Sequence, residues 1–162
     1  MRARVVVAIA IAGCGRIDFE SSARPDCTVA GPGEPCMSLM LGDVSWQDAV
    51  TACEQLDPPA HLATITNTDD NLAAAALAAR IPFESEDTNQ RQRMWIGGNS
   101  LAAVGIWKWI TEEPFGYTNW RVGQPGSPTT ERCLVLLGSQ GGLWDDRPCA
   151  YEYEAYLCER DE

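Results

Sequence analysis

Residues 133–158 read CLVLLGSQGGLWDDRPCAYEYEAYLC and combine three cysteines with a Trp-Asp-Asp sequence. Two of these cysteines, Cys133 and Cys149, flank a Gly-rich turn and a pair of adjacent carboxylates. A disulfide between these two cysteines would hold the turn rigidly and leave Cys158 for a distant partner. The residues alone therefore predict a disulfide-stapled turn with an aromatic anchor and two carboxylates.

The same spacing resembles the closing signature of the C-type lectin-like domain family. That signature is a Cys, a spacer, Trp-x-[Asn/Asp], two residues and a second Cys, then six residues, an aromatic, an aliphatic and a final Cys. The matching positions are Cys133, Trp144, Asp146, Cys149, Tyr156, Leu157 and Cys158. Upstream, in the family's order, stand a Trp-Ile-Gly motif at residues 95–97, Asn119-Trp120, and the triplet Gln124-Pro125-Gly126.

The resemblance covers residues 27–158 and implies a fold of the α+β class. The family fold has two helices, two small antiparallel sheets and a long irregular loop, stapled by disulfides. Residue types alone leave the cysteine pairing open. The family's pattern implies the pairs Cys27–Cys36, Cys53–Cys158 and Cys133–Cys149.

Local patterns predict two helices. The first spans residues 45–56, with Ser45 as its N-cap and Cys53 on the buried face. The second spans Leu72–Arg80 and follows residues 68–71. The aspartates of this segment interact favourably with the positive end of the helix dipole and are interpreted as capping residues. Strands are predicted over residues 61–65, 94–98 and 106–110.

Residues 111–131 form a long segment rich in Pro and Gly, and loops of this length are uncommon unless functional. Just before it, Trp107 and Trp109 share one face of a strand, where core packing is preferred over a sugar-stacking platform. His61 is the only histidine and lacks a catalytic frame, so a structural role is expected.

The amino-terminal part predicts export. Residues 1–13 combine arginines with a short apolar run, and residues 11–14 resemble a bacterial lipobox with Cys14 as the lipidated residue. An ordinary signal peptide with a free Cys14 is the alternative. Residues 14–26 are interpreted as a tether and residues 27–160 as the domain. We expect the lipid to anchor the chain to a bacterial membrane, with the outer membrane or the cell surface as the favoured location.

The resemblance also implies a calcium site. Residue by residue, the family's sugar-linked ligands fall on Gln124, Glu131, Asp145 and Asp146, which offer the oxygens that calcium prefers. A fifth ligand falls on Gly126, which has no side chain, and this departure weakens the expected Ca²⁺ site. The same four residues are the predicted ligand-binding set.

Composition narrows the functional classes. The formal net charge of −11 argues against a nucleic-acid partner. The first hypothesis is a surface-anchored carbohydrate-binding module assisted by calcium, and the alternative is a calcium-independent protein-recognition or structural module. An enzyme is not expected, because adjacent carboxylates such as Asp145 and Asp146 are poorly placed to flank a sugar from two sides. The sequence does not specify the sugar, the partner or the oligomeric state.

Overall fold

The computed structural model describes residues 36–82 and 92–161, so the predicted signal peptide, tether, Cys14 and Cys27 lie outside the described residues. The elements in chain order are β1 (Cys36–Val44), α1 (Trp46–Glu54), β2 (His61–Leu62), α2 (Thr68–Ala78), β3 (Arg93–Ala103), β4 (Ile106–Trp109), β5 (Cys133–Leu137), the 3₁₀ turn η2 (Gly138–Gln140), β6 (Leu143–Arg147) and β7 (Tyr153–Arg160). Within these residues, no helix is long and apolar enough to cross a membrane.

The strands form one sheet in the order β1-β7-β3-β5-β6, with β2 added to β7 and β4 added to β3. Neighbouring strands run antiparallel except β3 and β7, which pair in parallel at Met94 with Ala155 and at Trp95 with Tyr156. This short parallel pair joins the two predicted small sheets into a continuous one. The predicted α+β class, with two helices and a long irregular loop, is confirmed.

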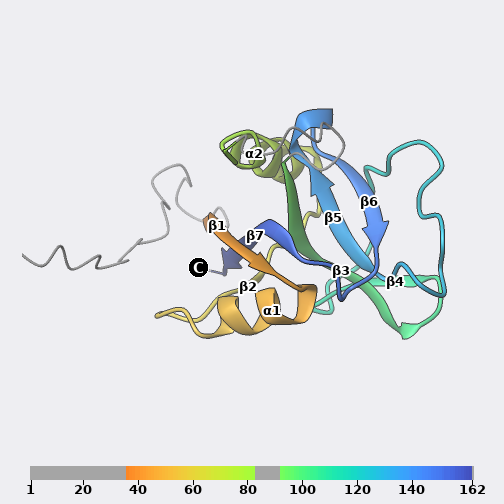
Figure 1. Ribbon diagram of the computed structural model, residues 1–162, viewed down its shortest axis with the longest axis horizontal. Coiled ribbons are helices and arrows are strands. Elements are labelled where there is room, and N and C mark those ends of the chain that lie inside the picture. Colours follow the sequence, from red (N-terminus) through yellow and green to blue (C-terminus); the bar gives the residue numbers. More distant parts are fainter. Residues whose placement is uncertain (1–35, 83–91, 162) are drawn as a thin grey trace, which may run out of the picture.

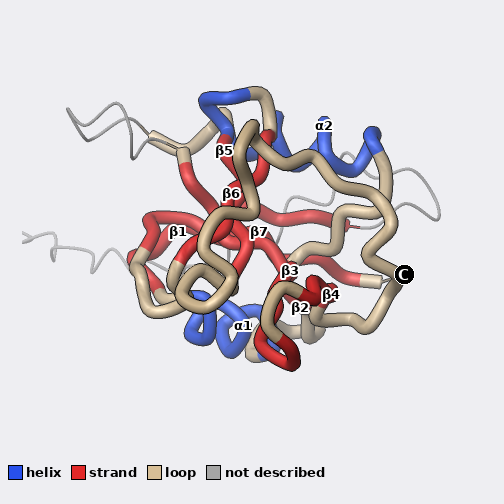
Figure 2. The backbone as a smooth tube through the Cα atoms, turned by 90° about the vertical axis from the view of Figure 1, so that its right-hand side faces the viewer, coloured by secondary structure: helices blue, strands red, loops and turns tan. Residues whose placement is uncertain are grey.

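The two helices lie on opposite sides of the sheet (Figures 1 and 2). Alternate residues of β3 therefore enter different cores, with Met94 and Ile96 on the α2 side and Trp95 on the α1 side. The strand β5, CLVLL, is buried at every position because both of its faces are covered.

The helix α1 begins as predicted. Ser45 is its N-cap, and the Ser45 Oγ accepts a hydrogen bond from the Asp48 amide at 3.2 Å. Its buried face carries Trp46, Ala49, Val50 and Cys53. The Trp46 indole N–H donates to the Ile96 carbonyl at 3.0 Å, which fixes the helix against β3.

The helix α2 begins at Thr68, four residues before the predicted start. Asn67 is the N-cap, and its Oδ1 accepts from the amides of Asp69 and Asp70 at 2.8 and 2.9 Å. The Asp70 carboxylate in turn accepts from the Thr66 amide, so the predicted capping role is confirmed for Asp70, and Asp69 also lies in the first turn of the helix. The prediction placed the start too late because it took the capping segment to precede the helix.

The predicted strands 94–98 and 106–110 are present as β3 and β4, and β3 extends beyond its prediction to Ala103. The predicted strand 61–65 is wrong in length, since only His61 and Leu62 pair with β7. Ala63 instead bridges two strands, because its amide donates to Leu157 and its carbonyl accepts from Gly97.

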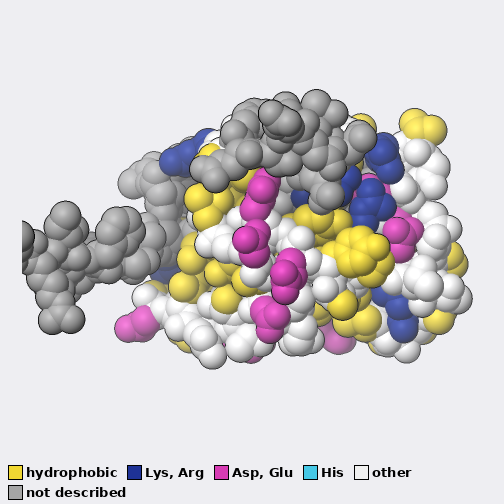
Figure 3. Space-filling view, viewed as in Figure 1, with side chains coloured by type: hydrophobic (Ala, Val, Ile, Leu, Met, Phe, Trp, Pro, Cys, Tyr) yellow, Lys and Arg dark blue, Asp and Glu magenta, His cyan; other side chains and the backbone are white. Residues whose placement is uncertain are grey.

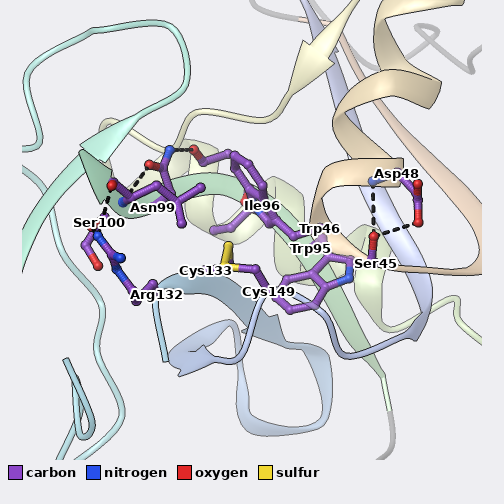
Figure 4. Close-up of a disulfide and its surroundings, with 12 residues drawn as sticks. Ser45, Trp46, Asp48, Trp95, Ile96, Asn99, Ser100, Arg132, Cys133 and Cys149 are labelled. Atoms are coloured by element: carbon purple, nitrogen blue, oxygen red, sulfur yellow. Dashed lines mark hydrogen bonds between the residues drawn. A yellow bond between two sulfur atoms is a disulfide. The ribbon is translucent and has the colours of Figure 1, made fainter. Parts of the chain in front are cut away.

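Two of the three predicted disulfides are confirmed. Cys53–Cys158 joins α1 to β7, and Cys133–Cys149 joins the start of β5 to the segment after β6. The second bridge lies in the core between α1 and the sheet (Figure 4). Cys36 is also disulfide-bonded, and its predicted partner Cys27 lies outside the described residues.

Candidate functional site

The long loop of residues 111–131 is anchored on Trp144, the Trp of the Trp-Asp-Asp stretch. Trp144 is fully buried, and its indole N–H donates to Asn71 Oδ1 of α2 at 2.8 Å. Aromatic rings from β4 and the loop surround it with centroid distances of 5.6 to 6.1 Å: Trp109, Phe115, Tyr117 and Trp120. Core packing of Trp109, preferred from the sequence, is confirmed by its exposed fraction of 1%.

Backbone hydrogen bonds then place the loop beside β6. The Trp144 amide donates to Asn119 and the Arg121 amide donates to the Trp144 carbonyl, both at 2.8 Å. The loop continues into a cis peptide bond between Gln124 and Pro125. The predicted site residues of the loop and of β6 are thereby brought to one place.

The Asp146 carboxylate accepts hydrogen bonds from the loop backbone. Its side chain is fully buried, and its two carboxylate oxygens lie 2.9 and 3.0 Å from the Gly126 amide nitrogen, which donates to them. A Cβ atom at Gly126 would lie 2.7 Å from Gln124 Oε1 and 3.8 Å from Glu131 Oε2. Gln124 and Glu131 therefore point toward the same small space beside Gly126.

Asp145 forms ion pairs with two arginines. Its Oδ2 lies 2.5 Å from a guanidinium nitrogen of Arg147 and 3.3 Å from one of Arg121. Arg147 also contacts Glu131 Oε1 and the Asp146 carbonyl oxygen, each at 3.4 Å. The Asp145 side chain is only 1% exposed, so these cations balance a carboxylate that has left water.

Burial separates the four predicted residues into two layers. Asp145 and Asp146 are buried, whereas Gln124 is partly exposed and the Glu131 side chain is 21% exposed. Gln124 Oε1 and Asp145 Oδ1 are themselves buried and have no hydrogen-bond partner among the described residues. A ligand from solvent can thus reach the outer pair directly and the aspartates only through their neighbours.

Sequence reasoning missed the two arginines of this cluster. A signal for Arg147 was present, because residues two apart on a strand share a face, and Arg147 follows Asp145 by two. Arg147 also lies near Tyr153, where burial raises the pKa of the phenol while Arg93 and Arg147 lower it in part. No comparable sequence pattern places Arg121, which reaches Asp145 only through the path of the loop.

In this arrangement the cluster does not fit a calcium ion. Arg147 already contacts Asp145 Oδ2, Glu131 Oε1 and the Asp146 carbonyl oxygen, and the Gly126 amide donates to both Asp146 carboxylate oxygens. Of the buried oxygens, Asp145 Oδ1 and Gln124 Oε1 are left without a partner among the described residues. No group of three or more acidic, His or Cys side chains set up for a metal occurs within residues 36–82 and 92–161. The two aspartates also have different partners, the Gly126 amide for Asp146 and Arg147 for Asp145.

Known proteins resemble this chain over most of its described length. C-type mannose receptor 2 of Mus musculus is 34% identical over 128 residues, which cover 72% of this chain but 8% of the receptor. A C-type lectin of Micrurus corallinus is 32% identical over 125 residues, covering 76% of this chain and 75% of that lectin. This chain thus corresponds to a small part of the receptor and to most of the lectin.

Solved structures and a family model agree with these relatives. The carbohydrate-recognition domain of cow CD23, solved in the presence of a GlcNAc2Man3 oligosaccharide, has a TM-score of 0.64 and 27% identity, covering 79% of this chain and 88% of that domain. The model of the Lectin C-type domain matches residues 43–160, which include both helices and the whole loop. The chain therefore belongs to the C-type lectin domain family.

Proposed function

We propose that this chain is an exported recognition module that binds a carbohydrate at the outer layer of the cluster. We call the place where these side chains meet the loop site and define it as the outer pair Gln124 and Glu131 together with the two arginines that contact the cluster, Arg121 and Arg147. The observation that carries the proposal is the convergence of charged donors and acceptors from two separate segments on one partly exposed place. The two disulfides fit an exported protein, because such bonds persist in oxidising compartments.

Sugar hydroxyls suit such a site because each one donates and accepts. A hydroxyl that donates to Glu131 can accept from Arg147 or from Arg121, whose side chain is 37% exposed. Hydrogen bonds to charged groups are stronger than neutral ones, so a few of them give useful affinity. Figure 3 shows basic side chains gathered on the side where β6, β4 and the long loop lie.

Relatives support a carbohydrate rather than another small ligand. Their names describe lectins and a mannose receptor, and the CD23 domain was solved with an oligosaccharide. Because the chain spans about 8% of the mannose receptor, the receptor's ligand is carried over here only as a proposal. Adjacent hydroxyls of a neutral sugar are the ligand class that the loop site favours.

Calcium and the lipid anchor remain separate parts of the proposal. Calcium-assisted binding through Gln124, Glu131, Asp145 and Asp146 would require Arg147 to leave the cluster, so sugar binding is proposed without a step through the metal. Attachment to a membrane through lipid at Cys14 is proposed from the sequence alone.

A glycan array probed with the purified, oxidised chain tests the proposal. We expect binding of neutral glycans in EDTA, and a loss of ten-fold or more in affinity for Glu131→Gln and Arg121→Gln, because charge-assisted hydrogen bonds are removed. Lys108→Gln is the matched control, since Lys108 is an exposed basic residue of β4 outside the loop site. An array without bound glycan in either EDTA or calcium would contradict the proposal.

A second function, recognition of a protein, is favoured by apolar exposure next to the loop. Val122 is 99% exposed, and Leu101, Val104 and Ile106 of the β3–β4 hairpin are 44 to 58% exposed. Arg132 joins the loop's end to this hairpin by donating to the Ser100 and Leu101 carbonyls (Figure 4). A blank array from a folded chain would move the search to protein partners of this surface.

A further inference from the structure

Arg147 occupies the centre of the cluster in which the family resemblance places calcium. One guanidinium nitrogen contacts Asp145 Oδ2 at 2.5 Å, and the other lies 3.4 Å from both Glu131 Oε1 and the Asp146 carbonyl oxygen. The Arg147 side chain is 18% exposed, so it is held inside the cluster and does not extend into water. Three oxygens from two segments of the chain therefore share one cation.

The charge of this cation is permanent. A guanidinium stays protonated at every physiological pH, and its planar fork suits carboxylate oxygens. Asp145 needs such a partner because an isolated carboxylate with 1% exposure is strongly disfavoured. With Arg121, the cluster contains two guanidinium groups for the three carboxylates of Glu131, Asp145 and Asp146.

We propose that Arg147 takes the place of a metal cation, so that the loop is held on β6 in a calcium-independent way. The proposal goes beyond ligand identity and holds whichever ligand the loop site binds. A divalent ion that used Asp145 Oδ2, Glu131 Oε1 or the Asp146 carbonyl oxygen would have to displace the guanidinium, because two cations at hydrogen-bond distance from one oxygen repel each other.

The oxygens left without partners show what the site would do without Arg147. Gln124 Oε1 and Asp145 Oδ1 are buried and accept no hydrogen bond among the described residues. Glu131 Oε2 lies near Gln124 Oε1, since both are within 4 Å of one point beside Gly126. Removing the guanidinium would free further oxygens of Asp145, Glu131 and Asp146, which together resemble the oxygen set that calcium prefers.

The test uses Arg147→Gln in the purified, oxidised full chain, with thermal unfolding in EDTA and in millimolar calcium. We expect the wild-type midpoint to be the same in both solutions. We expect Arg147→Gln to unfold several degrees lower in EDTA and to recover in calcium. Isothermal titration with calcium chloride should detect binding by the variant but not by the wild-type chain.

Arg132→Gln is the matched control, because Arg132 lies near Cys133 but donates to backbone carbonyls of Ser100 and Leu101 and not to carboxylates. It should show no calcium response. Calcium stabilisation of the wild-type chain equal to that of Arg147→Gln would overturn the proposal, as would an Arg147→Gln chain that folds, unfolds at a lower temperature in EDTA and is not stabilised by calcium.

If Arg147→Gln folds only when calcium is present, the proposal is supported. If it folds in neither solution, Arg147→Lys decides, since lysine keeps the charge without the planar fork. A calcium-insensitive Arg147→Lys chain supports the proposal, and a calcium-stabilised one overturns it. Glycan binding is read separately on the array, so a failure of the proposed function is distinguishable from a failure of this inference.

Discussion

Glu159 of β7 is a buried carboxyl group outside the loop site that makes stability depend on pH. It is 5% exposed, and its Oε2 accepts from the Thr64 amide at 2.6 Å. Burial raises the pKa of Glu159 to about 7, although the Thr64 hydrogen bond and His61 oppose this, while Asp70 and Asp161 add to it. The folded chain therefore holds a proton that the unfolded chain releases near its ordinary pKa of 4.5.

The sign of the effect follows from linkage. Between the unfolded pKa and about 7 the folded state binds more protons, so the free energy of unfolding falls as pH rises through this window. Glu159→Gln removes the titration and keeps an oxygen for the Thr64 amide. We expect the free energy of unfolding of the variant, taken relative to that of the wild-type chain, to rise by about 1 kcal/mol or more between pH 5 and pH 8. One pKa unit corresponds to about 1.4 kcal/mol. Urea unfolding at each pH measures this, and parallel pH profiles would contradict it.

At the scale of elements, the sequence predicted positions better than boundaries. The helix α1 was found because apolar spacing and the capping residue Ser45 agree, whereas α2 was found from its Ala-rich run and the aspartates before it. The start of α2 was placed late because its first turn is polar and carries no apolar period to mark it. The strand at His61 was overpredicted because residues that alternate like a strand can instead bridge two strands, as Ala63 does.

Asn67 caps the first turn of α2. Asn67→Ala removes the oxygen that accepts from the Asp69 and Asp70 amides, so we expect a loss of about 1 kcal/mol in the free energy of unfolding. Asn67→Ser keeps a capping oxygen and is the control, expected to lose clearly less. Urea unfolding measures both, and equal losses for the two variants would show that the cap does not stabilise this helix.

At the scale of the whole molecule, the resemblance predicted which segments meet but not how their charges pair. The order of motifs was enough to bring Gln124 and Glu131 beside Asp145 and Asp146, because the family fold fixes the path of the chain. The family motifs do not include Arg147, although its spacing of two from Asp145 on β6 puts both side chains on one face. The pairing of Arg147 and Arg121 with these carboxylates therefore had to come from the structure.

The two disulfides whose cysteines both lie among the described residues constrain the chain over different lengths. Cys53–Cys158 spans 105 residues and closes the domain, whereas Cys133–Cys149 spans 16 residues and closes only β5 and β6. In the chain-entropy model the long bridge contributes about 4.7 kcal/mol and the short one about 3 kcal/mol, since the unfolded chain loses more freedom in the longer loop.

We therefore expect the paired substitution of Cys53 and Cys158 by alanine to lower the free energy of unfolding by more than the paired substitution of Cys133 and Cys149, measured in urea. The two variants should also differ in which backbone amides exchange faster. Hydrogen exchange should rise throughout the sheet for the first, because its bridge ties α1 to β7, and mainly over β5, β6 and the loop site for the second. A larger loss from the short bridge would mean that packing around Cys133, and not loop closure, sets its contribution.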